Sequence, residues 1–332
     1  MRFQLRVFSI ALLSIHVISW MSDAHAQSAS RTDDESAVLA PVVVSASKRG
    51  QTLGQLNGSA SVVDRTSLDD DQVTSTLELD RVFPELYTSH SATFLFPIIT
   101  LRSVTSAQDF YNPALTVYVD GVPQLSTFAV QSLLGVEQVE LLKGPQGTLY
   151  GKSAQGGVLN IVSRKPGKIP EFAARAGVSN RDGYQLQVEG SGPLIEDLLY
   201  GAVSLLGNDV NGDLRSDVIG SDQLGGVRSR AGNAKLRLAP SGSPWEVWMT
   251  AGRDCATGDQ EAYTLFDDYK SRRAYVLSNL PEAYRDFHQK RCANSAAVNG
   301  QYDFGIWRLN AVVSRAPRNS HLLLKVGQHA VW

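Results

Sequence analysis

One stretch constrains this chain more than any other: residues 136–166, which read VEQVELLKGPQGTLYGKSAQGGVLNIVSRKP. An apolar run carrying charges opens the stretch and a β-rich run closes it, so both ends are predicted to be strands. The middle contains Gly144-Pro145, Gly147, Gly151 and Gly156-Gly157, residues that allow tight turns and close approach of the backbone. The pattern predicts a compact strand–loop–strand scaffold.

The sequence Gly151-Lys152-Ser153 invites a nucleotide-binding interpretation, because phosphate-binding loops end in Gly-Lys-Ser or Gly-Lys-Thr. Such a loop also needs a glycine five residues before Gly151, and that position holds Gln146. A helix pattern should follow, yet a glycine pair and a β-rich run follow instead. The glycines are therefore better explained as tight structural turns than as a phosphate site.

Composition narrows the classes of function. The chain has 332 residues, and its 31 basic and 33 acidic side chains give a formal net charge of −2, so no nucleic-acid partner is indicated. Outside the N-terminus no apolar run reaches about 18 residues, the length of a membrane-spanning helix. The 28 glycines suit a turn-rich β architecture. The six histidines are scattered, without the spacing of metal ligands.

The first 26 residues have the pattern of a signal peptide. Arg2 and Arg6 give a positive start, residues 7–18 are largely apolar, and Ala24-His25-Ala26 is a small-residue cleavage site. We therefore expect the mature chain to begin at Gln27, outside the cytoplasm.

A flexible arm is expected next, because residues 27–38 are polar and rich in small side chains. A short β-branched run follows in it, made of Pro41, Val42, Val43, Val44 and Ser45. A run of this kind in a flexible arm is suited to strand addition to the sheet edge of another protein. The alternative is a first strand of the globular domain itself.

Residues 53–166 read as a small mixed domain. Strands are expected at residues 61–63, 98–101 and 117–122, and the last is a hairpin that turns at Asp120-Gly121. Residues 67–71 read as an acidic turn. Apolar positions between residues 77 and 83 suit a short helix ended by Pro84.

After Pro166 the pattern becomes one of alternating apolar and polar residues. Six strands are predicted, at residues 172–178, 184–188, 198–205, 231–238, 245–251 and 306–313. Short and long connections alternate between them, and the longest covers residues 253–305, which is the pattern of an outer-membrane barrel. Trp245, Trp248 and Trp307 would then belong to aromatic girdles at the membrane interfaces; the alternative is the core of a soluble sandwich.

Both cysteines, Cys255 and Cys292, lie in this longest connection, which is predicted to face outward. Disulfides persist outside the cytoplasm, so we expect the two residues to be bonded to each other.

Residues 136–166 resemble the closing segment of the plug domain of TonB-dependent outer-membrane siderophore receptors, whose pattern is roughly VExVExLRGPxGxLYGxxAxGGxINIVT. Lys143 stands where that pattern usually has Arg, and Leu101-Arg102-Ser103 departs from the family's Leu-Arg-Gly element. The resemblance implies an α+β plug domain followed by the first strands of an antiparallel transmembrane β-barrel. That barrel is expected to be incomplete, because plugged receptors use about 22 strands.

The resemblance also implies a division of the chain and a function. It assigns residues 1–26 to a signal peptide, 27–52 to a flexible arm with the TonB box at Pro41–Ser45, 53–166 to the plug, and 167–332 to the N-terminal part of the barrel. The function implied is uptake of a ferric siderophore across the outer membrane, with no enzymatic chemistry. The implied partners are TonB with its inner-membrane complex, the siderophore and outer-membrane lipid. Iron would arrive already chelated, so no cofactor bound by protein ligands is expected.

Candidate ligand contacts are expected on two plug loops: Asp109, Phe110, Tyr111 and Asn112 on the first, and Phe128 and Gln131, which are weaker candidates, on the second. The aromatic pair suits stacking on the rings of a phenolate siderophore. The alternative is that both rings anchor the loop within the plug.

Four charged residues are expected to pair with charges that face the lumen of the barrel: Arg102, Glu137, Glu140 and Lys143. A catalytic carboxylate pair is disfavoured, because Glu137 and Glu140 lie three apart on a strand and face opposite sides. A rival of another class is a non-transporting periplasmic or membrane-associated β protein that acts as a binding module. Dependence on detergent would separate it from a membrane receptor.

Overall fold

The computed structural model describes residues 43–46, 51–56, 58–91, 93–105, 115–124, 130–150, 154–179, 182–212, 214–216, 221–259, 288–315 and 320–328. The expected signal peptide, residues 41 and 42 of the arm, and the candidate ligand residues 109–112 and 128 lie outside these ranges. Within the described ranges no helix is long and apolar enough to cross a membrane.

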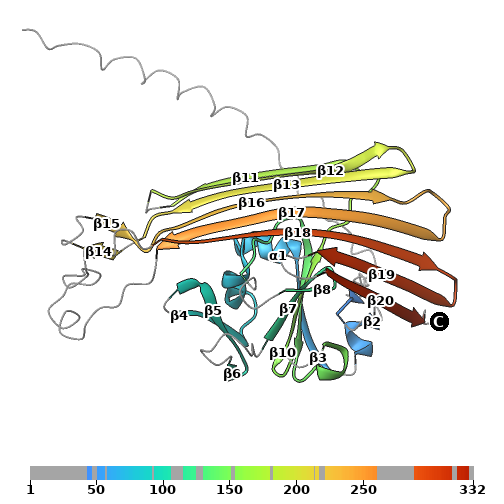
Figure 1. Ribbon diagram of the computed structural model, residues 1–332, viewed down its shortest axis with the longest axis horizontal. Helices are drawn as coiled ribbons and strands as arrows, with labels where there is room; N and C mark the ends of the chain where they lie inside the picture. The colour runs from blue at the N-terminus through green and yellow to red at the C-terminus, as the bar shows by residue number, and fades with distance from the viewer. Residues whose placement is uncertain are drawn as a thin grey trace, which may run out of the picture. The chain divides into compact units, whose positions relative to one another are not determined.

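A five-stranded sheet forms the centre of the plug region, the name used here for residues 53–166 (Figure 1). In spatial order its strands are β3 (Ser59–Asp64), β9 (Val136–Lys143), β10 (Gly157–Ser163), β7 (Leu115–Val119) and β8 (Val122–Pro123). The two strands predicted at the ends of residues 136–166 are therefore confirmed, and they pair antiparallel as β9 and β10. Val139, Leu141 and Leu159 are at most 1% exposed and form the centre of the apolar core.

Glycine is required at two places in this sheet. The turn between β7 and β8 is Asp120-Gly121, with φ of 48° and 82°, as in the two-residue turns that match the twist of a hairpin. At Gly157 a Cβ atom would lie 2.3 Å from the carbonyl oxygen of Leu142 and 2.7 Å from a methyl carbon of Leu101. Only glycine permits this close packing of β10 against its neighbours.

Two short helices cover part of the plug core. Of the residues expected to form only an acidic turn, residues 67–70 belong to α1 (Arg65–Asp70), because the Asp64 carboxylate accepts from the amide of Ser67 at 2.9 Å and caps a helix there. The expected helix before Pro84 is the 3₁₀ helix η2 (Thr76–Arg81), which begins with a capping box of Ser75 and Glu78.

The remaining elements of this part of the chain are small. They are β1 (Val43–Val44), β2 (Gln51–Thr52), η1 (Leu53–Gln55), β4 (Leu86–Ser91), β5 (Thr93–Leu101), β6 (Val104–Thr105) and α2 (Gly147–Tyr150). The strand expected at residues 98–101 is thus the end of β5.

The second large sheet, called the wall sheet here, has eight antiparallel strands that follow chain order apart from one small hairpin (Figure 1). They are β11 (Glu171–Val178), β12 (Tyr184–Ile195), β13 (Leu199–Val210), β16 (Val227–Leu238), β17 (Trp245–Asp259), β18 (His288–Asp303), β19 (Trp307–Arg315) and β20 (Ser320–Gln328). The hairpin is β14 (Leu214–Ser216) with β15 (Ser221–Leu224). Among the described strands, β11 and β20 are the two edges of the wall sheet.

The wall sheet corrects the prediction for residues 253–305. Strand β17 continues to Asp259 and β18 begins at His288, so much of the expected loop is strand. The sequence of β18, HQKRCANSAAVNGQYD, offers mostly small residues where apolar ones were sought, which explains why it was not predicted. Strand β20 was not among the six strands predicted after Pro166.

The two faces of the wall sheet differ in polarity. Apolar side chains stand exposed on one face: Leu186 is 53%, Leu205 54%, Leu236 48% and Met249 53% exposed. Buried polar side chains occupy the other face, which contacts the plug region: Gln187, Glu189, Ser204, Lys235 and Asn299. Apolar-out and polar-in alternation is the pattern of a transmembrane barrel wall.

Candidate functional site

The strand-forming run of the arm is docked on the plug region. Val43 and Val44 form β1, which pairs antiparallel with β2, and Val44 is completely buried. The arm was expected to be flexible over residues 27–52; within that range residues 43–46, 51 and 52 have a defined place in the structure. The side chain of Val44 packs with Leu142 and Val158 of the central sheet, so an apolar contact holds this segment.

The carboxylate of Glu140 binds the backbone of the docked arm. One oxygen accepts from the amide of Ser45 at 2.8 Å and from its hydroxyl at 2.9 Å, and the other accepts from the amide of Ala46 at 2.6 Å. Gln138 and Asn160 also donate to Glu140, at 2.6 and 3.0 Å. Glu140 is 0% exposed, so its charge is stabilised by these donors instead of by water.

A tyrosine pair completes the contact. The hydroxyl of Tyr150 donates to the carbonyl oxygen of Ala46, and the ring of Tyr118 lies edge-on to the ring of Tyr150 with centroids 4.7 Å apart. Burial raises the pKa of Tyr150, and the nearby charge of Glu140 adds to this rise. The phenol therefore stays protonated and available as a donor.

The four charges expected to face the barrel have other surroundings. Lys143 pairs with Glu85 at 2.5 Å, Glu140 holds the arm, and Arg102 donates to Ser59 at 3.4 Å. These partners lie in the arm or the plug region, so the prediction of pairs with the wall is wrong for these three residues. Glu137 is exposed, on the face of β9 opposite to Glu140, as the strand period predicts.

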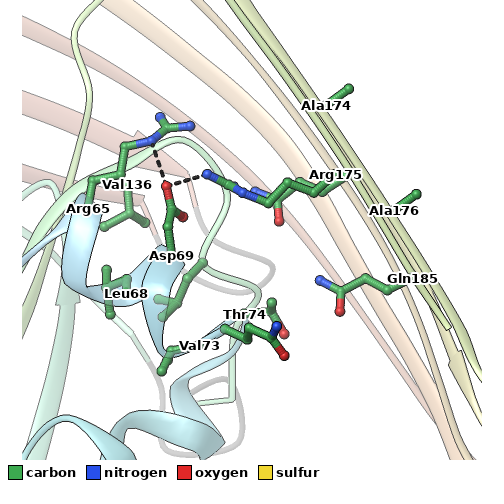
Figure 2. A pocket seen from close by; sticks show the side chains of 14 residues that line it. Arg65, Leu68, Asp69, Val73, Thr74, Val136, Ala174, Arg175, Ala176 and Gln185 are labelled. Atoms are coloured by element: carbon green, nitrogen blue, oxygen red, sulfur yellow. Dashed lines mark hydrogen bonds and ion pairs between the residues drawn. The ribbon is translucent and has the colours of Figure 1, made fainter. Parts of the chain in front are cut away.

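Different residues pair the plug region with the wall sheet. Arg65 of α1 binds Glu189 of β12 at 2.7 Å, and Arg175 of β11 pairs with Asp69 of α1. Figure 2 shows Asp69 between the two arginines, beside a cavity of about 410 Å³ that α1, β11 and β12 line. Glu189 also accepts from the amide of Gly135 at 3.0 Å.

A second buried cation lies further along the wall sheet. Lys235 of β16 is 5% exposed, lies 3.6 Å from Asp120, and donates to Ser163 and to the carbonyl oxygen of Arg164, the latter at 3.1 Å. Sequence reasoning missed Arg65, Glu189 and Lys235. The available signal was a charge on the polar face of a strand, for Glu189 and Lys235, or at the start of a helix, for Arg65, but their partners are far away in sequence.

A cavity of about 280 Å³ lies beside the docked arm. Ser45, Tyr150 and Asn160 line it from the arm and plug region, and Trp248 and Asn299 line it from the wall sheet. The Lys165 ammonium lies 3.8 Å from the centre of the Trp248 ring, a cation–π contact. Trp248 therefore faces inward and is not part of an outer aromatic girdle, whereas Trp307 is 46% exposed.

The structure describes one candidate ligand residue, Gln131. Its side chain donates to Gln124 at 2.8 Å and lines a cavity of about 150 Å³ that Asp254 and Arg291 of the wall sheet also border. The structure brings Gln131 together with these two wall residues, which the sequence did not single out.

The disulfide between Cys255 and Cys292 is confirmed. Its place is not a loop, because the two cysteines are directly opposed on β17 and β18.

Comparison with known proteins identifies the class of domain that the first half of the chain contains. Residues 52–158 match the family model of the TonB-dependent receptor plug domain. The chain thus carries a plug domain of the TonB-dependent receptors, followed by antiparallel strands that resemble the start of the barrel of such receptors.

Particular relatives narrow the comparison. The chain is 46% identical over 272 residues to the pesticin receptor of Yersinia pestis, covering 82% of this chain and 40% of that protein. The crystal structure of the ferric yersiniabactin uptake receptor from Yersinia pestis matches with a TM-score of 0.75 and 46% identity, over 81% of this chain and 42% of that one. The ferripyoverdine receptor of the outer membrane of Pseudomonas aeruginosa shares only the fold, with a TM-score of 0.65 and 17% identity over 86% of this chain and 37% of that one. The chain spans about two fifths of the length of the curated relatives it matches most extensively.

Proposed function

We propose that this chain functions in the outer membrane as a TonB-dependent receptor for uptake of a ferric siderophore similar to yersiniabactin. One observation carries the proposal: a plug domain lies against the polar face of a wall sheet while a strand-forming arm is docked on the plug. The 46% identity to the pesticin receptor and to the ferric yersiniabactin uptake receptor supports the choice of ligand.

The arm is the coupling element in this proposal. Its residues 41–45 would pair with an edge of the periplasmic TonB protein by strand addition. Val43 and Val44 pair with β2, and the amide of Ser45 donates to Glu140, so these backbone groups must leave their present partners before they pair with TonB. The free energy that holds the arm on the plug region must therefore be overcome before TonB can bind it.

The ligand would be bound where plug loops meet the wall. The proposed contacts are Asp109, Phe110, Tyr111, Asn112 and Phe128. Gln131 is a further proposed contact, and it lies within the residues that the structure describes. Iron is the cargo and would arrive inside its chelate. The proposed steps are binding, release of the arm and passage, and none of them makes or breaks a covalent bond.

A rebuilt receptor tests the proposal. Residues 1–315 are continued with the remaining strands of the Yersinia pestis pesticin receptor and expressed in a Gram-negative strain that lacks siderophore receptors of its own. Binding and uptake of radiolabelled ferric yersiniabactin are measured separately, and both are expected to be gained.

The variant Val43→Pro isolates the arm, because proline cannot donate to an added strand. Binding should persist and uptake should be lost, while Ser36→Pro, in the polar part of the arm, should transport normally. Uptake by Val43→Pro would remove the TonB-box assignment. A chain that binds no ferric siderophore and stays dispersed without detergent would instead support the rival, non-transporting binding module.

A further inference from the structure

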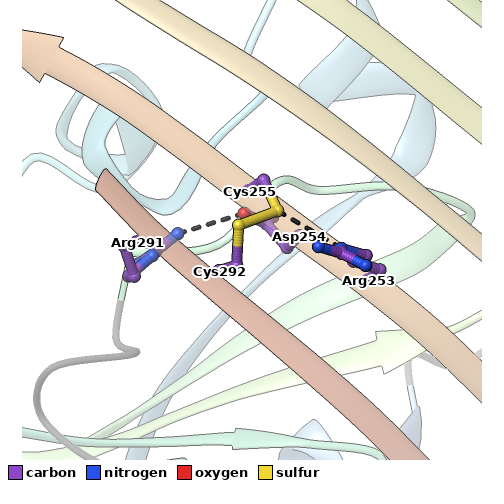
Figure 3. Close-up of a disulfide and its surroundings, with 5 residues drawn as sticks. All are labelled: Arg253, Asp254, Cys255, Arg291 and Cys292. Atoms are coloured by element: carbon purple, nitrogen blue, oxygen red, sulfur yellow. Dashed lines mark hydrogen bonds and ion pairs between the residues drawn. A yellow bond between two sulfur atoms is a disulfide. The ribbon is translucent and has the colours of Figure 1, made fainter.

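A disulfide and an ion pair are formed by neighbouring residues of the same two strands, β17 and β18 (Figure 3). Cys255 and Cys292 are directly opposed in the β17–β18 register, with their Cα atoms 4.1 Å apart. Asp254 and Arg291 each precede one of these cysteines, so their side chains leave the sheet on the other face. The carboxylate of Asp254 and the guanidinium of Arg291 meet there at 3.1 Å.

This ion pair binds the backbone of the plug domain. One oxygen of Asp254 accepts from the amide of Ser132 at 2.9 Å, and a guanidinium nitrogen of Arg291 donates to the carbonyl oxygen of Val130. One acceptor and one donor on the wall thus satisfy an N–H and a C=O that lie two residues apart. Arg291 is 8% exposed, so little water competes for this contact.

The plug domain holds the same segment from its other side. The amide of Gln131 donates to the hydroxyl of Thr76 at 2.9 Å, and the amide of Leu133 donates to the carbonyl oxygen of Thr74 at 2.8 Å. The side chain of Gln131 reaches back to Gln124 at 2.8 Å. This bond joins the described residues on either side of positions 125–129.

We propose that Asp254 and Arg291 are positioning residues for the plug loop at residues 130–133, and that the Cys255–Cys292 disulfide keeps them in register. A disulfide between directly opposed residues prevents the two strands from slipping or separating where they lead into residues 260–287. The loop would thereby be fixed before a ligand arrives, which reduces the entropy lost on binding. The ligand, a ferric siderophore, is taken from the proposed function, whereas the control of the loop is independent of it.

Hydrogen exchange in the full chain, folded in detergent, tests the control of the loop. In Asp254→Ala the amides of Gln131, Ser132 and Leu133 should all exchange roughly tenfold faster or more, while the amide of Val139 in the plug core stays unchanged. Asp254→Asn keeps an acceptor for Ser132 and should restore part of the protection. The matched control Arg253→Gln changes a neighbouring charge whose contact, 3.4 Å from the sulfur of Cys255, lies on the disulfide face.

Three results would overturn the inference. Acceleration of Ser132 alone would reduce Asp254 to a local hydrogen-bond partner. Equal acceleration of Val139 would show general destabilisation instead of positioning. Unchanged exchange in all three loop amides in the double variant Cys255→Ser with Cys292→Ser would show that the disulfide does not keep Asp254 and Arg291 in register.

Binding of ferric yersiniabactin to the rebuilt receptor tests the consequence for the ligand. Asp254→Ala should weaken affinity by roughly tenfold with the amount of folded receptor unchanged, and Asp254→Asn should lie between it and the wild type. Normal affinity in Asp254→Ala would show that the loop does not serve the ligand. A wild-type receptor that binds no siderophore would refute the proposed function while leaving the exchange result to stand.

Discussion

The sheet of the plug domain and the wall sheet are both β structures, but they are stabilised in different ways. The plug sheet encloses an apolar core in which Leu141 and Leu159 are at most 1% exposed. The wall sheet leaves its apolar residues outside, with Leu205 54% exposed, and turns polar residues such as Lys235 inward. The described part of the wall therefore has no apolar core of its own.

This difference shows where each sheet obtains its stability. The plug sheet is stabilised by the removal of apolar surface from water, as the core of a soluble domain is. The wall sheet needs an apolar environment for its outer face and bonding partners for its inner polar face. The pairs Arg65–Glu189 and Lys235–Asp120 supply such partners from the plug. Truncating an apolar side chain should therefore destabilise the plug sheet strongly and the wall sheet only weakly.

The largest effect is expected from Leu141→Ala, which leaves a cavity at the centre of the plug sheet. Its cost should be about 2–5 kcal/mol of the free energy of unfolding. The matched variant Leu236→Ala, on the outer face of the wall where the side chain is 48% exposed, should cost about 0.5 kcal/mol or less in detergent. Proteolysis of the full chain across a urea series measures both. Similar losses in the two variants would contradict the comparison.

Sequence reasoning succeeded where structure is determined locally. Strands β9 and β10 and the turn at Asp120-Gly121 follow from residue periods and turn chemistry within a few positions. It failed for β18, whose residues are small or polar because one face meets the plug. The contact of Ser45 with Glu140 joins residues 95 positions apart, and no local pattern encodes it.

A smaller effect is expected at the junction of the arm and the plug. Glu140→Gln removes a charge that accepts from the backbone of Ser45 and Ala46, and should weaken docking of the arm by about 1.5–3 kcal/mol. A spin label at position 43, where Val43 is 47% exposed, should become mobile. The control is Glu137→Gln, three residues away on the exposed side of the same strand. A label that stays immobile in Glu140→Gln, or moves equally in both variants, would contradict the role of this carboxylate.

The smallest effect is a dependence on pH at the rim of the plug sheet, where Glu85 meets Lys143 at 2.5 Å and Ser61 at 3.0 Å. Burial alone would raise the pKa of Glu85, but the hydrogen bonds and the charge of Lys143 prevail and hold it below its ordinary value. A lowered pKa in the folded state means that the ionised carboxylate stabilises the fold. This contribution is complete above the ordinary pKa of a glutamate and is lost as the pH falls through the lowered value.

Because the pair is partly open to solvent, its contribution should be at most about 1 kcal/mol, and less in high salt. Urea midpoints of the wild type and of Glu85→Gln, followed from about pH 7 to about pH 3, should differ at neutral pH and converge in acid. The variant Lys143→Met should remove the same dependence from the partner's side. If the urea midpoints of the wild type and of Glu85→Gln still differ in acid, Glu85 acts through packing and not through its charge. The rim of the plug sheet would then be stabilised by packing, as its core is.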